Sequence, residues 1–391
     1  MSAQSLASRP GTATRPIGPT VGMVGGGQLA RMTHQAAIAL GVELAVLTED
    51  PLAPAVGAGA RCVQGAATEL DSLMALAAGS DVVTFDHERV PTAHLTALQQ
   101  AGVRVVPDPA AKLLAQDKLH ARRTFAALGL PVPDFELART VAEVTAFATV
   151  HGWPLIAKAP RGGYDGRGVF TVADAEEARA VLADHPGGVL VEPRLDITCE
   201  LAVLVARSTT GETAVYPVVE TIQEDAMCRE IIAPARVDED LAAAARELAL
   251  VLVEGVDATG LVAVELFVTA DGLMVNEVAL RPHNSGHYTI EGCATSQFEQ
   301  HLRAVLGWPL GPTTLCAPAV VTVNVVGPDD GSDPARRLGF ALGVPGAHVH
   351  LYGKTAVPGR KLGHVTVCGR DHDSARSAAR GAVELLTGER S

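Results

Sequence analysis

Short apolar runs alternate with Ala- and Leu-rich helical patterns in the first part of the chain. Segment 20–50 has the pattern of a strand, a Gly-rich turn, a helix and a second strand, and 80–86 and 102–109 contain two further β-branched runs. Strands alternating with helices are typical of a parallel, doubly wound sheet. We therefore expect an N-terminal α/β domain over 20–115, preceded by a disordered tail at 1–19.

The pattern changes after a helical segment and a Pro-rich exit at 106–135, which is typical of a domain boundary. Short strands around Gly-rich or polar turns follow, then a strongly periodic helix at 238–256 and a hairpin at 261–278. The last ~80 residues mix strands with a C-terminal helix. This mixture predicts an α+β remainder, divided into a central domain at 116–200 and a C-terminal domain at 201–391.

Composition narrows the function classes. The formal net charge is −13 and no Lys/Arg block stands out, so nucleic acid and anionic membranes are not expected partners. The apolar runs are far shorter than the ~18–20 residues of a membrane helix. The six cysteines form no C-x-x-C pair, which favours a reducing cytoplasm. The polar start lacks an apolar signal-peptide core; a transit peptide is the alternative to a tail.

Two Gly-rich loops suggest phosphate binding. Gly25-x-Gly27-x-x-Ala30 opens a helix after the first strand, and Glu49 ends the next strand, so an NAD site is one interpretation and simple packing is another. The second loop, 162–168, holds four glycines with interleaved charges and follows Lys158. It is not a Walker A sequence. Its backbone N–H groups and cations favour a mobile phosphate lid, and a plain hairpin is the alternative.

The hairpin at 261–278 predicts a metal site. A three-residue turn at 270–272 would pair Thr269 with Leu273, Phe267 with Val275, and Glu265 with Glu277. Facing carboxylates repel each other unless a cation lies between them, and Mg²⁺ takes carboxylate oxygens together with water and phosphates. A solvent-exposed pair that repels weakly is the alternative. In an ideal strand Asn276 points to the opposite face.

The segment "RPHNSGH" follows the hairpin. His283 and His287 have the spacing of a helix-borne metal pair, but Pro282 and Gly286 oppose a helix. A loop with Arg281, His283 and Asn284 instead offers donors to a small oxyanion. Further on, Lys354, Arg360 and Lys361 surround a Pro-Gly turn, where either solvated charges or a phosphate site is expected.

Together these motifs resemble the ATP-grasp enzymes, and more closely the N5-carboxyaminoimidazole ribonucleotide synthetases. The resemblance covers about residues 20–370 and rests on "GGGQLARM", "RGGYDGRG", "NE…RPHNSGH", "SQFEQHLRAV" and "GRKLGHV". It implies an ATP-grasp fold with an N-terminal domain, a central lid domain and a C-terminal domain that completes the cleft. It also implies a homodimer and the partners ATP, bicarbonate and aminoimidazole ribonucleotide.

The resemblance assigns roles residue by residue. Arg281, His283 and Asn284 would be catalytic and hold bicarbonate, and Glu265 and Glu277 would hold Mg²⁺. The ATP site would comprise Lys118, Lys158, Gly163, Tyr164, Asp165, Gly166, Arg167, Gly168, Val169, Glu192, Pro193, Arg194, Leu195, Glu200, Gln223, Asn276 and Glu277. The ribonucleotide would contact Gly27, Gln28, Leu29, Glu88, Tyr164, Asp165, Arg167, Lys354, Arg360 and Lys361.

The implied reaction activates bicarbonate with ATP as carboxyphosphate, which carboxylates the ribonucleotide amine. Departures from the family pattern occur at Asp86-His87, Cys199, Gln223 and Leu280. The alternatives are a sister ATP-grasp ligase, such as a formate-dependent glycinamide ribonucleotide transformylase, an NAD-dependent dehydrogenase, and a catalytically inactive homologue. The dehydrogenase leaves the glutamate hairpin unexplained.

Overall fold

A computed structural model describes residues 18–162, 168–224 and 226–388. Residues 1–17 of the expected tail, and Gly163 to Arg167 of the expected phosphate lid, therefore lie outside the described residues. Within them, no helix is both long and apolar enough to cross a membrane.

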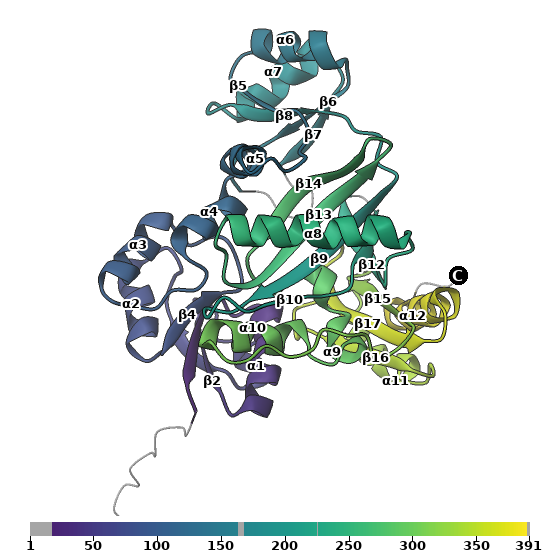
Figure 1. The fold of residues 1–391 in the computed structure, drawn as a ribbon. Coiled ribbons are helices and arrows are strands. Elements are labelled where there is room, and N and C mark those ends of the chain that lie inside the picture. Colours follow the sequence, from purple (N-terminus) through teal and green to yellow (C-terminus); the bar gives the residue numbers. More distant parts are fainter. Residues whose placement is uncertain (1–17, 163–167, 225, 389–391) are drawn as a thin grey trace, which may run out of the picture.

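The N-terminal part is a parallel sheet of order β3-β2-β1-β4, as the doubly wound prediction requires (Figure 1). β1 and β4 are buried along their whole length, which explains their continuous apolar runs. The run at 102–109 forms only a single bridge, Val105 to Val83, because Pro107 and Pro109 within it cannot donate to a ladder. The elements are β1 (Thr20–Val24), α1 (Gln28–Leu40), β2 (Glu43–Thr48), η1 (Val56–Ala58), β3 (Arg61–Gln64), α2 (Leu70–Ala78), β4 (Val82–Phe85) and α3 (Thr92–Gln100).

A small antiparallel sheet of order β5-β8-β6-β7 projects from the rest of the molecule, at the top of Figure 1. Two helices, α6 and α7, cover one face and enclose a separate apolar core. A capping box between Thr140 and Glu143 begins α6, and Asp174 caps α7. This part comprises β5 (Glu136–Ala138), α6 (Val141–His151), β6 (Leu155–Lys158), β7 (Val169–Val172), α7 (Ala175–Asp184) and β8 (Val189–Pro193); α4 (Pro109–Gln116) and α5 (Lys118–Ala127) lead into it.

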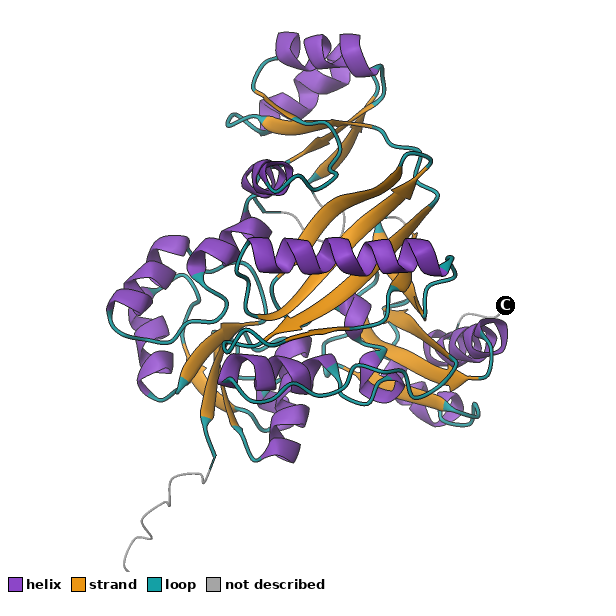
Figure 2. Cartoon of the chain, in the orientation of Figure 1, coloured by secondary structure: helices purple, strands orange, loops and turns teal. Residues whose placement is uncertain are grey.

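The remaining strands form one antiparallel sheet of order β14-β13-β9-β11-β12-β15-β17-β16, with β10 paired to β9 (Figure 2). This continuous sheet joins the glutamate hairpin at one edge to the C-terminal strands at the other. Its strands are β9 (Cys199–Arg207), β10 (Thr213–Val215), β11 (Val219–Glu224), β12 (Met227–Ala233), β13 (Gly260–Thr269), β14 (Gly272–Ala279), β15 (Ala319–Val326), β16 (Ala347–Leu351) and β17 (Lys361–Gly369).

Helices pack against both halves of this sheet. The predicted helix at 238–256 is confirmed as α8, and its buried alanines and leucines pack on β9 and β13. At the other end, Glu230 of β12 accepts hydrogen bonds from Arg376 and Arg380 of α12, both at 2.6 Å. The remaining elements are α8 (Glu239–Gly255), η2 (Asn284–Gly286), α9 (Thr289–Gly292), α10 (Gln297–Leu306), η3 (Pro334–Arg337), α11 (Leu338–Ala341) and α12 (His372–Thr387).

Candidate active site

The β13–β14 hairpin brings Glu265 and Glu277 opposite each other, as the sequence predicts. The predicted turn is wrong, however: Thr269 pairs with Gly272, and Leu266 pairs with Val275. A register shift between Glu265 and Leu266 leaves Asn276 as an extra residue on β14. This β-bulge restores the glutamate pairing that the actual turn would otherwise have displaced by one residue.

The bulge also changes the place of Asn276. Instead of facing away, Asn276 lines the same small pocket as Glu277, together with Lys158. Lys158 Nζ lies 3.5 Å from Asn276 Oδ1 and 2.7 Å from Glu192 Oε2. A bulge re-aims a side chain, and here it adds an amide to a pocket that is otherwise lined by charged and apolar groups.

Arg122 is a pocket residue that the sequence interpretation missed. Its Nε donates to Glu192 Oε1 at 2.6 Å, and its NH1 donates to the Asn276 carbonyl. Burial opposes ionisation of Glu192, but Arg122 and Lys158 hold its pKa below the usual value. The available signal was helical spacing, because Arg122 lies one turn after Lys118 on α5 and both line the pocket.

The facing carboxylates of Glu265, which is half-buried, and Glu277 are suited to a divalent cation. Burial, with Glu277 and Glu200 nearby, raises the pKa of Glu265 to about 8. A cation between Glu265 and Glu277 would remove this cost. Among the described residues no group of three or more His, Cys, Asp or Glu could hold a metal, so the protein offers two carboxylates and leaves positions for water and phosphate. This donor set fits Mg²⁺. Glu277 is exposed, so its side chain faces open solvent.

The prediction that the segment after β14 forms no α-helix is confirmed, because its residues Asn284–Gly286 form a 3₁₀ turn. His283 Nδ1 accepts from the Ser285 backbone N–H, at 3.3 Å. In the neutral tautomer that fits this hydrogen bond the proton is on Nε2, and Nε2 lies 3.3 Å from Glu265 Oε1. His283 thus contacts Glu265, one of the two carboxylates suited to a metal, but the described residues contain no cluster of three metal-ligating side chains there.

Arg281 joins the N-terminal domain to this segment. Its Nε donates to Glu88 Oε1 at 3.1 Å, and Glu88 Oε2 accepts from Lys112 at 2.6 Å. Burial raises the pKa of Glu88, but Lys112 and Arg281 outweigh it and hold the pKa below the usual value. Lys112 is fully buried and also lies over the Phe85 ring. Sequence analysis missed Lys112, which no motif marks.

Asn284 completes the group of candidate anion donors. Its buried Nδ2 makes no hydrogen bond to an oxygen or nitrogen of the described residues and lies near the thiol of Cys228. Burial raises the pKa of that thiol to about 12, so it stays protonated. A buried amide donor beside a neutral thiol is available to an incoming oxyanion.

The N-terminal Gly-rich loop lies next to the C-terminal basic residues. Leu29 of α1 packs in one apolar cluster with Tyr352, and Lys354 Nζ lies 5.5 Å from the Tyr352 ring centroid. Lys354 also donates to the Lys361 carbonyl at 3.3 Å. Gly25 has φ +110°, and a Cβ there would lie 1.6 Å from Asp86 Oδ1, so the loop requires glycine.

Asp86, one of the residues that differ from the family pattern, bonds the backbone of this loop. The Gly27 N–H, at the start of α1, donates to Asp86 Oδ2 at 2.8 Å. Arg360, in contrast, is exposed and donates to the Thr355 carbonyl. The structure therefore gathers Gly27, Leu29, Lys354 and Lys361 around one region, with Arg360 at its margin.

The other candidate ATP residues lie at the end of β8, in the segment after it, at the start of β9 and on β11. Glu192 to Leu195 lead from β8 toward Glu200, which lies near Gln223 of β11 and Glu277. Burial raises the pKa of Glu200, while a hydrogen bond from Gln223 opposes this. Leu280 lies in the hydrophobic core cluster beneath α8, and the partly buried Cys199 packs against it, so both departures contribute to the core. Gly168 and Val169 lie at the start of β7 beside the undescribed lid residues.

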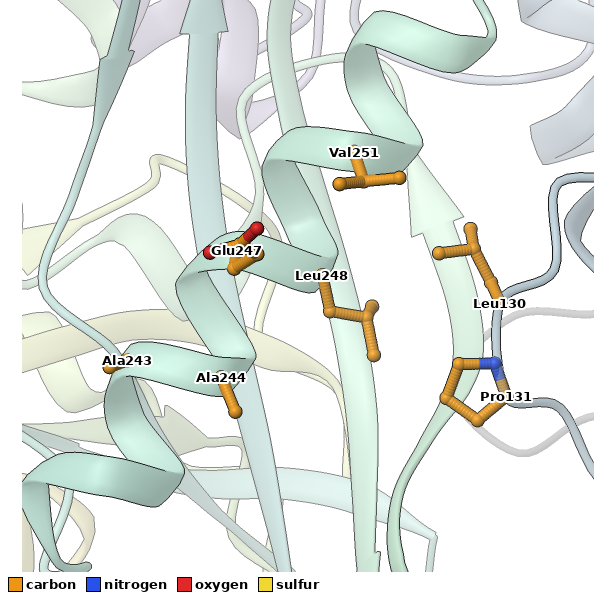
Figure 3. A pocket seen from close by; sticks show the side chains of 7 residues that line it. All are labelled: Leu130, Pro131, Ala243, Ala244, Glu247, Leu248 and Val251. Atoms are coloured by element: carbon orange, nitrogen blue, oxygen red, sulfur yellow. The ribbon is translucent and has the colours of Figure 1, made fainter.

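A second hollow lies between α8 and the segment Leu130–Pro131, away from these groups (Figure 3). Its lining is apolar apart from Glu247, and Figure 3 shows Leu248 facing Leu130 and Pro131. It holds none of the predicted site residues, so the candidate site is the one built around the hairpin.

Three family models match successive parts of the chain. A ribonucleotide synthetase preATP-grasp domain matches 19–116, an ATP-grasp domain matches 123–298, and a phosphoribosylaminoimidazole carboxylase C-terminal domain matches 320–378. The N5-carboxyaminoimidazole ribonucleotide synthase of Mycobacterium tuberculosis is 50% identical over 373 residues, covering 93% of this chain and 87% of that protein. The chain belongs to this family. The predicted ATP-grasp fold is confirmed.

Other relatives agree with this assignment. The Corynebacterium ammoniagenes synthase is 42% identical, covering 94% of this chain and 92% of that protein. An Aspergillus clavatus synthase in complex with ADP and 5-aminoimidazole ribonucleotide has a TM-score of 0.87 and 34% identity, covering 94% of this chain and 98% of that one. Membership of this family opposes the dehydrogenase alternative.

Proposed function

We propose that this chain carboxylates 5-aminoimidazole ribonucleotide with bicarbonate and ATP, giving N5-carboxyaminoimidazole ribonucleotide, ADP and phosphate in purine biosynthesis. The observation that carries the proposal is a group of adjoining contacts: Glu265 pairs with Glu277 and contacts His283, and Arg281, which is paired with Glu88, lies near enough to offset part of the rise that burial causes in the pKa of Glu265. A phosphate-activating site and a seat for a small anion are thus directly adjacent, within a fold whose relatives carry this name.

The nucleotide would lie between the two β-layers. Lys118, Lys158 and the missed Arg122 line one pocket and would place positive charge at its phosphates. Residues 192–195, Glu200 and Gln223 would contact the rest of the nucleotide, and Glu200 is hydrogen-bonded to Gln223. Mg²⁺ held by Glu265 and Glu277 would neutralise phosphate charge and orient the γ-phosphate. Gly163 to Val169 would close over the phosphates and exclude water, which destroys carboxyphosphate.

Arg281, His283 and Asn284 would hold bicarbonate against the γ-phosphate. Arg281 supplies a fixed cation, Asn284 an unengaged amide donor, and His283 an Nε2–H on the side of Glu265. Fixing the attacking oxygen in line is the main contribution that a protein makes to phosphoryl transfer. Carboxyphosphate, or the CO₂ released from it, would then be captured by the amine of the ribonucleotide.

The ribonucleotide would occupy the region between Gly27–Leu29 and Lys354. Lys354, Arg360 and Lys361 would bind its 5′-phosphate, while Glu88, Tyr164, Asp165 and Arg167 would contact the remainder; the last three lie outside the described residues. We also propose a homodimer in a reducing cytoplasm. All six cysteines are free thiols, which agrees with such a compartment.

ADP release with and without added bicarbonate, in CO₂-free buffer containing the ribonucleotide, tests the proposal. We expect turnover that requires both bicarbonate and the ribonucleotide. Turnover that depends on formate and glycinamide ribonucleotide instead would assign the chain to the sister ligase, and no bicarbonate dependence would overturn the proposed function.

A further inference from the structure

One buried side chain outside the assigned site, Gln297 of α10, holds the backbone of the anion segment. Its Oε1 accepts from the His283 N–H at 2.8 Å, and its Nε2 donates to the His283 carbonyl at 2.8 Å. The oxygen and the nitrogen of the Gln297 amide thus both bond the backbone of His283, a residue of the candidate bicarbonate site. Gln297 is fully buried, so water does not compete for these hydrogen bonds.

The backbone fixes which way the amide points. A main-chain N–H only donates and a carbonyl only accepts, so the oxygen and nitrogen of Gln297 cannot be exchanged. Gln297 Nε2 also lies 3.1 Å from His287 Nδ1, to which its second hydrogen can be donated. This nitrogen must accept, and the His287 ring is therefore neutral with its proton on Nε2.

His287 extends the contact to the strand that begins with Lys361. Its ring stacks on His364 of β17 with centroids 4.9 Å apart, and His364 stacks on His350 of β16 at 4.6 Å. His364 Nδ1 also bonds the Tyr352 hydroxyl at 2.8 Å. Through His287, Gln297 thus contacts the strand β17, which begins at the candidate phosphate-binding residue Lys361.

The turn is shaped to accept this amide. A Cβ at Gly286 would lie 2.4 Å from Gln297 Oε1, so only glycine lets the 3₁₀ turn pack against the glutamine. The Gln297 N–H also bonds Thr289 Oγ1 at 2.8 Å. Four hydrogen bonds and a steric requirement at Gly286 thus converge on one side chain and its backbone nitrogen.

We propose that Gln297 is a positioning residue for the bicarbonate seat: it sets the His283 backbone, and with it the directions of the flanking Arg281 and Asn284. This inference rests on the proposed function. Displacing reacting groups by about 1 Å can cost up to about a hundredfold in rate, so a residue that fixes a backbone at this point acts on substrate binding without touching substrate.

The same helix offers a matched control in Gln300. Gln300 is equally buried, and its amide holds one backbone residue, Gly311, in the same way, with both hydrogen bonds at 2.8 Å. Gly311 lies in the segment after α10, outside the assigned site. Loss of Gln300 should therefore cost stability in the same manner while leaving the anion segment in place.

The experiment compares Gln297→Leu, Gln297→Glu and Gln300→Leu in the full-length chain by bicarbonate and ATP titrations of ADP release, with thermal unfolding of each. Gln297→Glu keeps the size and the acceptor for the His283 N–H but faces the His283 carbonyl with an oxygen. We expect both Gln297 variants to raise the KM for bicarbonate about tenfold and to change the KM for ATP by less than about twofold. Gln300→Leu should lower Tm to a similar extent with both KM values unchanged.

A bicarbonate KM within about twofold of the parent chain in both Gln297 variants would overturn the inference, as would an equal rise in Gln300→Leu. If only Gln297→Glu folds, it decides by the same criterion. If neither folds while Gln300→Leu does, the role is structural and the inference is wrong. Failure of the proposed function is distinguishable, because the parent chain itself would then show no bicarbonate dependence.

Discussion

Glu277 shows how far a single residue can be interpreted from sequence. Period-2 alternation with an assumed three-residue turn placed it opposite Glu265, and the pairing is observed, although it depends on a β-bulge that offsets the shorter turn. The exposure of Glu277 could not be predicted, because it depends on how the small sheet and the large sheet frame the site. An exposed carboxylate that is paired with a half-buried one on the same hairpin can bind a metal that also contacts a ligand.

Glu277→Gln is expected to lower kcat/KM at least about a hundredfold, because losing a metal carboxylate removes about 3 kcal/mol of transition-state stabilisation. The fold should persist, since the exposed side chain supports no core contact. Asp271→Asn, at the exposed turn of the same hairpin, is the matched control and should retain full activity. Steady-state kinetics and circular dichroism measure both effects; near-parental rates in Glu277→Gln would refute the metal assignment.

At the scale of elements, α5 contacts two other elements of the candidate site. Through Arg122 it contacts β8 at Glu192 and β14 at the bulge carbonyl of Asn276. The bulge itself escaped prediction because a strand pattern shows no extra residue until the partner strand is known. The true turn, one residue shorter than expected, and the bulge compensate each other, which is why the predicted glutamate pair survived a wrong turn.

Arg122→Met is expected to lower the free energy of unfolding by about 3 kcal/mol, because it leaves the buried Glu192 with a single cationic partner. Arg123→Met, the neighbouring exposed residue on the same helix, should change it by less than about 0.5 kcal/mol. Urea unfolding followed by circular dichroism gives both values. Equal effects of the two substitutions would show that the buried ion pair adds no particular stability.

At the scale of the whole molecule, α10 links the N-terminal sheet to the large sheet. His301 Nδ1 accepts from the Leu261 N–H of β13 at 3.2 Å, and its Nε2 bonds Thr84 Oγ1 of β4 at 2.9 Å. Neighbouring Leu302 and Val305 pack with β1 in one core cluster. The domains therefore share a buried polar contact as well as an apolar one.

This link predicts acid sensitivity. Burial lowers the pKa of His301 from 6.5 to about 4, so between these values the unfolded chain binds more protons than the folded one. The stability that His301 contributes is complete above pH 6.5 and is lost as the pH falls toward 4, by up to about 3 kcal/mol. His301→Gln, which keeps a donor and an acceptor but does not titrate, should flatten this part of the curve.

Urea unfolding of both proteins at several pH values between 4 and 7 provides the measurement. Other buried histidines, His287 and His364, also have lowered pKa values and contribute acid sensitivity to both proteins, so the difference between the curves isolates His301. Parallel curves would contradict the assignment of this slope to His301.

The sequence by itself determined the alternation of elements, the absence of an α-helix at "RPHNSGH" and the family, because periodicity, proline and clustered motifs are local properties of the chain. It also predicted the facing glutamates, but the bulge that brings them opposite each other was decided by strand pairing. Only the tertiary structure decided which distant groups meet: Lys112 with Glu88 and Arg281, Arg122 with Glu192, and Gln297 with His283. These partners lie 14 to 193 residues apart, and their pairing follows from burial, since a buried polar group must find its partner wherever the fold brings one.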